Sequence, residues 1–81
     1  MRLKLRFFAS HREAMGNERR TVEVPEGTNV GQLLDRLAVE NPALKKLEGH
    51  TIVAVNQEQV ERGHRLKDGD EVAMYPPVGG G

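Results

Sequence analysis

Residues 30–38 read VGQLLDRLA, and this stretch decides how the chain folds. Its apolar residues recur at intervals of three and four, which places five of them on one side of a helix: Val30, Leu33, Leu34, Leu37 and Ala38. Thr28 or Asn29 can cap the start of this helix, and Asn41-Pro42 should end it. A helix with one apolar stripe has to lie on another element, so the rest of the chain must supply a surface for it.

Strand patterns on both sides of the helix provide that surface. Leu3, Leu5 and Phe7 alternate with charged residues, as in a strand that buries one face. Further strands are predicted at residues 20–24, 51–56, 59–61 and 71–75, the third of these being weak. Both terminal strands are apolar enough to be central, and the route between them contains the helix that parallel pairing requires. The prediction is an α+β fold with a mixed sheet and one main helix on one face.

Shorter signals fill the connections. Ser10 followed by Glu13 is a capping-box pattern, which predicts a brief helix at residues 11–15 that Gly16-Asn17 ends. Residues 43–47 can add another helical turn after the main helix. Asp68-Gly69-Asp70 predicts a tight turn before the last strand.

Length and composition exclude several classes of function. With 81 residues the chain forms one domain, and the absence of cysteine excludes disulfides, thiolate metal sites and a cysteine nucleophile. A formal net charge of zero argues against a nucleic-acid binder with a broad basic face. No apolar stretch is long enough to span a membrane or to act as a signal peptide, so the expected compartment is the cytoplasm.

Histidines and carboxylates do not form a recognisable ligand set. The three histidines are widely separated and are interpreted as ordinary surface residues: His11, His50 and His64. Asp68, Asp70 and Glu71 are explained by turn chemistry around Gly69 rather than by a metal loop. We therefore expect no metal site.

The most informative segment for function is the end of the chain, Pro76-Pro77-Val78-Gly79-Gly80-Gly81. The two prolines favour extended backbone, and six residues can reach roughly 20 Å at about 3.3–3.6 Å each. Glycine has no Cβ, so the carbonyl carbon of Gly81 would be open to attack. The predicted division is a domain at residues 1–75 and a tail at residues 76–81 with a free, reactive carboxylate. The alternatives are a frayed end or an expression remnant.

A partner surface is expected beside this tail. The helix covers one face of the sheet, and on the open face Phe8 and Tyr75 could form an apolar patch. Packing of Phe8 under the short helix is the slightly favoured alternative for that residue, whereas Tyr75 is interpreted as an interface residue. The candidate partner-binding residues are Phe8, Tyr75, Pro76 and Pro77.

Several motifs together resemble one family. They are Phe7-Phe8-Ala9 followed by Arg12-Glu13, Val53-Ala54-Val55-Asn56, Leu66 with Asp68-Gly69-Asp70-Glu71-Val72, and Pro76-Pro77-Val78 with Gly80-Gly81. In their order and spacing they look like the small subunit of molybdopterin synthase, the MoaD family of ubiquitin-like sulfur carriers within the MoaD/ThiS superfamily. The resemblance implies a β-grasp (ubiquitin-like) fold. Met74-Tyr75 stands where members often have two phenylalanines, which bears on the choice of partner.

The resemblance also implies a chemistry. Gly81 would be adenylated and converted to a thiocarboxylate that donates sulfur to the cyclic pterin precursor, with Val78, Gly79 and Gly80 inserted in the partner. The implied partners are a large, MoaE-like subunit in a heterotetramer, a MoeB-like E1-type enzyme that uses ATP, and a sulfur donor such as a cysteine desulfurase or rhodanese. The chain itself would bind no cofactor and would not be an enzyme. Alternatives are a carrier for thiazole, cysteine or tRNA thiolation, a ubiquitin-like modifier, and a plain binding module.

Overall fold

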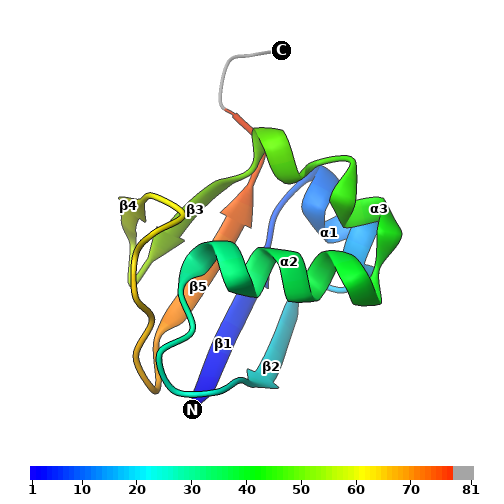
Figure 1. Ribbon diagram of the computed structural model, residues 1–81. Coiled ribbons are helices and arrows are strands. Elements are labelled where there is room, and N and C mark those ends of the chain that lie inside the picture. Colours follow the sequence, from blue (N-terminus) through cyan, green and yellow to red (C-terminus); the bar gives the residue numbers. More distant parts are fainter. Residues whose placement is uncertain (78–81) are drawn as a thin grey trace.

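The computed structural model describes residues 1–77, in which five strands form one mixed sheet. The elements in chain order are β1 (Arg2–Phe7), α1 (Ser10–Met15), β2 (Arg19–Glu23), α2 (Val30–Glu40), α3 (Pro42–Lys45), the 3₁₀ turn η1 (Glu48–His50), β3 (Ile52–Val55), β4 (Glu58–Val60) and β5 (Glu71–Tyr75). The strand order is β2-β1-β5-β3-β4, with β1 and β5 parallel and the other pairs antiparallel. This is the predicted β-grasp arrangement, with α2 lying across one face (Figure 1).

The core lies between α2 and the sheet. All five residues of the predicted helical stripe are buried, and they meet Leu3, Leu5 and Phe7 of β1, none of which is more than 1% exposed. At the start of α2, the Asn29 side chain accepts from the Gln32 amide while Gln32 Oε1 accepts from the Asn29 amide, at 2.8 and 2.9 Å. Asn41 ends the helix as predicted, because Pro42 follows it and begins α3.

The predicted elements are all present, and their bounds differ by one or two residues. The predicted capping box at Ser10 is wrong: Ser10 is already helical and the N-cap is Ala9, whose side chain cannot cap. Ala9 adopts φ 50°, because the chain turns sharply as it leaves β1. Gly16 ends α1 in the left-handed conformation with φ 78°, as predicted.

The topology brings three segments to one end of the sheet. Since β1 and β5 are parallel, their carboxyl ends lie together, and the antiparallel β3 begins at the same end. Tyr75 therefore lies opposite Ile52 and next to Phe8, whose amide donates to the Met74 carbonyl at 3.1 Å. Figure 1 shows the N-terminus at the opposite end of the sheet from this point. Among residues 1–77, no helix has the length and apolar character needed to cross a membrane.

Candidate functional site at the end of the last strand

The open face of the sheet carries an apolar surface where β5 ends. Ile52 pairs with Tyr75 and Ala54 pairs with Ala73, and all four alternate with core residues, so they face away from α2. We call the exit patch the group Phe8, Ile52, Ala54, Ala73 and Tyr75. Except for Ala54, which is buried but lies outside the core cluster, these residues are half-buried. A group of neighbouring apolar side chains that remain partly exposed to solvent is typical of an interaction surface.

Phe8 belongs to this patch rather than to the core, so the interpretation that placed it under the short helix is wrong. Phe7 is fully buried, and because side chains alternate along a strand, Phe8 points to the other face. The Phe8 and Tyr75 rings meet edge to face, with centroids 6.2 Å apart. The Arg6 guanidinium lies over the Phe8 ring, 5.0 Å from its centroid. Tyr75 is on the open face, as predicted.

Sequence reasoning missed Ile52, Ala54 and Ala73 as parts of the exit patch, and it missed Arg6 as the cation beside the patch. Arg6 Nη1 is 3.9 Å from Glu71 Oε1, and its Nε is buried without a hydrogen-bond partner among residues 1–77. The sequence could have placed Arg6 on the open face of the sheet, because Arg6 alternates with Leu5 and Phe7, which face the core. Ile52 and Ala73 could be found only from the pairing of β3 with β5, because they lie 21 residues apart in the chain.

The tail begins at this patch. Pro76 is half-buried and Pro77 is exposed, directly after the last residue of β5. The predicted insertion residues Val78, Gly79 and Gly80, and the predicted reactive residue Gly81, lie outside the described residues. Their roles stay predictions, as do the partner contacts of Phe8, Tyr75, Pro76 and Pro77.

The interpretation of all three histidines as surface residues is wrong for His11. His50 and His64 are exposed, but His11 is only 1% exposed. Its Nε2 lies 2.7 Å from Thr51 Oγ1, and burial lowers the pKa of His11 from its ordinary value of 6.5. Its sequence neighbours Arg12 and Glu13 are exposed, so composition alone did not indicate this burial.

Asp68 and Asp70 take part in turn chemistry as predicted, whereas Glu71 begins β5 and its carboxylate faces Arg6. Asp68 Oδ1 accepts from the Arg2 amide at 2.7 Å, and Asp70 accepts from the Lys67 amide and from Asn56 Nδ2 at 2.8 and 2.9 Å. Throughout residues 1–77, no three side chains of the His, Cys, Asp or Glu type come together as a metal site would need. Asp68 and Asp70 stabilise the connection from β4 to β5 and tie it to Arg2 of β1 and to Asn56 in the turn after β3.

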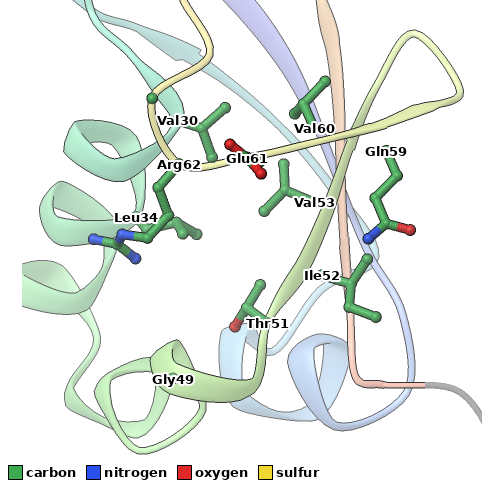
Figure 2. Close-up of a pocket in the computed structure, with 11 residues that line it drawn as sticks. Val30, Leu34, Gly49, Thr51, Ile52, Val53, Gln59, Val60, Glu61 and Arg62 are labelled. Carbon is green, nitrogen blue, oxygen red and sulfur yellow. The ribbon is translucent and has the colours of Figure 1, made fainter.

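A separate groove opens on the helix side of the sheet, between α2 and the β3–β4 hairpin (Figure 2). Its volume is about 770 Å³, and its apolar wall is formed by Val30, Leu34, Val53 and Val60. Arg62 at its rim pairs with Asp35, at 3.3 Å between Nη2 and Oδ1. Thr51, the partner of His11, lies at the end of the groove beside η1. Ile52 of the exit patch also lines this groove, so the two surfaces adjoin at the edge of β3.

Two relatives match this chain in sequence over all or nearly all of its length. The Chlamydomonas reinhardtii molybdopterin synthase sulfur carrier subunit is 39% identical and covers 100% of both chains. The Escherichia coli (strain K12) protein of the same name is 41% identical over 98% of this chain and 99% of its own.

Two solved structures add to the sequence comparison. SAMP1 from Haloferax volcanii matches with a TM-score of 0.85 and 32% identity, over 100% of both chains. A chain in the complex of subunits 1 and 2 of the molybdopterin-converting factor from Helicobacter pylori 26695 matches with a TM-score of 0.71 and 27% identity, again over 100% of both. The ThiS family matches residues 5–81. Because the family match spans all but the first four residues and the identities extend over the full length of both chains, the chain belongs to the ThiS family, the MoaD/ThiS group of ubiquitin-like proteins.

Proposed function

We propose that this chain is the sulfur carrier subunit of a molybdopterin synthase, with the sulfur held as a thiocarboxylate on Gly81. The observation that carries the proposal is identity of 39% and 41% to proteins of that name over essentially their whole length. The position of the exit patch supports the proposal. An apolar surface next to the start of the tail would let a partner bind the domain while the terminal carboxylate reacts.

The chemistry requires activation of the terminal carboxylate. A carboxylate oxygen attacks the α-phosphorus of ATP and pyrophosphate leaves, which produces an acyl adenylate with AMP as a good leaving group. The terminal sulfur of a donor persulfide then attacks the carbonyl carbon and AMP departs, which gives an acyl disulfide. A second thiol, supplied by a partner or a small-molecule reductant, attacks the donor's sulfur in that disulfide. The thiocarboxylate leaves, and the donor and the second thiol are left joined as a disulfide. Glycine at the last two positions keeps the carbonyl free of side-chain hindrance. ATP and the catalytic groups belong to the activating partner.

The partners follow from this division of labour. The Helicobacter pylori neighbour comes from a complex of subunits 1 and 2 of the molybdopterin-converting factor, which supports a second-subunit partner here. We assign the exit patch, Pro76 and Pro77 to that interface, and residues 78–80 to insertion in the partner's active site. An E1-like adenylating enzyme and a sulfur donor, such as a cysteine desulfurase or rhodanese, complete the proposal. The expected assembly with the large subunit is a heterotetramer.

One observation favours a second candidate function. SAMP1 is named a small archaeal modifier protein, and the Haloferax volcanii protein matches this chain at 32% identity with TM-scores of 0.85 and 0.84 in two structures. An adenylated glycine can react with a lysine amine as well as with sulfur, so the same tail could form an isopeptide bond. Transfer of sulfur into a different product, such as a thiazole, cysteine or a tRNA base, uses the same first steps.

Intact mass spectrometry separates these functions. The chain is incubated with its E1-like enzyme, ATP and a sulfur donor, with and without the large subunit and the pterin precursor. Exchange of one oxygen for sulfur at Gly81, followed by loss of that sulfur only when the large subunit and the precursor are present, supports the proposal. A lysine adduct supports the modifier, and an unchanged mass overturns both. Deletion of residues 79–81, which removes every terminal glycine, is the negative control, and Lys45→Arg, on the exposed surface of α3, is the matched positive control.

A further inference from the structure

A buried hydrogen bond bridges the two sides of the last strand where the tail begins. His11 is on α1, which follows β1, and Thr51 immediately precedes β3. The two strands β1 and β3 flank β5 in the sheet, and all three meet at this end. The 2.7 Å contact between His11 Nε2 and Thr51 Oγ1 therefore connects the neighbours of β5 on either side of its end.

The geometry fixes which atom donates. The Thr51 hydroxyl has one hydrogen, and Oγ1 donates it to the Leu47 carbonyl at 2.8 Å. Oγ1 must then accept from His11, so the proton of the imidazole is on Nε2. Nδ1 is left unprotonated and is buried without a hydrogen-bond partner among the described residues. A proton added at Nδ1 would have no acceptor, so the neutral ring is the form that fits this position.

Charged residues near His11 in the chain or on the adjoining elements are exposed or lie on the open face of the sheet. Arg12 and Glu13 on α1, Lys45 on α3 and His50 on η1 are exposed. Arg6, Glu71 and Tyr75, on the neighbouring β1 and β5, belong to the open face of the sheet. Burial is the cause of the lowered pKa of His11.

We propose that His11 is a positioning residue, whose hydrogen bond to Thr51 holds β1 and β3 against the end of β5 and so fixes the base of the tail. This role rests on the proposed function, because only a chain that acts through its tail needs a fixed exit. The bond acts locally. The His11–Thr51 bond lies near the end of the β1–β5 ladder where the Phe8 amide donates to the Met74 carbonyl. The Lys4 amide, which donates to the Asp70 carbonyl, lies at the opposite end of the same ladder.

Amide hydrogen exchange measured by NMR at those two positions tests the proposal. The variants are His11→Phe, which keeps a ring without a donor, and Thr51→Val, which removes the hydroxyl. Each should raise exchange at the Phe8 amide about fivefold while the Lys4 amide changes little, the factor expected from one net hydrogen bond. His11→Gln, which restores a donor near the position of Nε2, should return Phe8 exchange toward that of the native chain. His64→Phe, at an exposed histidine, should alter neither amide.

Three outcomes of these exchange measurements would contradict the proposal. Equal acceleration at both amides, or none, overturns the proposal, as does failure of His11→Gln to restore protection. If neither His11→Phe nor Thr51→Val folds, the ¹⁵N chemical shifts of the native imidazole decide: a neutral ring with hydrogen on Nε2 at pH 7 supports the bond, and any other form refutes it. None of these measurements needs a partner enzyme. A failure of adenylation in the native chain would therefore count against the proposed function alone.

Discussion

Phe8 and Tyr75 meet edge to face with their ring planes 85° apart, which joins the residue after β1 to the last residue of β5. The two residues are 67 positions apart in the chain and become neighbours only because β1 and β5 pair in parallel. The pair lies directly before Pro76, so this contact surface adjoins the segment that we propose inserts in a partner.

Tyr75→Ala should weaken the complex with the large subunit about 5–30-fold, because aromatic residues at the centre of an interface cost about 1–2 kcal/mol or more when truncated. The loss should exceed that caused by deletion of Gly81, since the tail is thin and Tyr75 adjoins a broader patch. Isothermal titration calorimetry measures both. Tyr75→Phe, which keeps the ring, is the matched control, and an affinity unchanged by Tyr75→Ala would contradict the assignment of the exit patch.

Gly80→Val should abolish thiocarboxylate formation and change the melting temperature by no more than about 2–4 °C, because a substitution outside the predicted domain at residues 1–75 should cost no more than about 0.5 kcal/mol. A β-branched side chain restricts the backbone and crowds the neighbouring carbonyl. Mass spectrometry after activation and thermal unfolding report the two properties. A parallel loss of folding would show that the tail is not separable from the domain.

His11 should make the domain less stable in mild acid. Its pKa is lowered in the folded state, so below the ordinary value of 6.5 the unfolded chain binds a proton that the folded chain does not. The contribution of His11 is therefore fully present above about pH 6.5 and is lost as the pH falls toward the folded-state pKa. Urea unfolding of the native chain and of His11→Gln measures this at pH values from about 7.5 to about 5, which span the pH range in which histidine titrates. Parallel profiles for the two proteins would exclude the effect.

Asp70→Ala should lower the free energy of unfolding by about 1.5–3 kcal/mol, the usual range for hydrogen bonds to a charged group. Asp70 is 9% exposed and accepts from Lys67 and Asn56, so its loss leaves both donors without this acceptor. Chemical denaturation measures the change. Glu58→Ala, at an exposed position of β4, is the control and should change stability by less than about 0.5 kcal/mol. Normal thiocarboxylate formation by folded Asp70→Ala is expected, because the turn lies at the other end of β5.

The elements were predictable because their signals are local. The spacing of apolar residues in α2, the alternation in β1 and the limits of β5 can all be read within a few residues, and each was confirmed. Ser10 and Glu13 fit the sequence pattern of a capping box, but the turn at Ala9 makes Ala9 the N-cap and places Ser10 inside the helix. The tail residues 78–81 could be singled out from the sequence but lie outside the described residues.

By itself the sequence determined the order of strands and helices, the apolar stripe of α2 and the Pro-Pro-Val-Gly-Gly-Gly tail, since each depends on neighbours along the chain. The tertiary structure alone decided that Phe8 faces Tyr75, that Ile52 and Ala73 complete the exit patch, and that His11 is buried against Thr51. The physical reason is that these contacts depend on which strands pair and in what register. Such pairing joins residues from distant parts of the chain, and no local pattern encodes it.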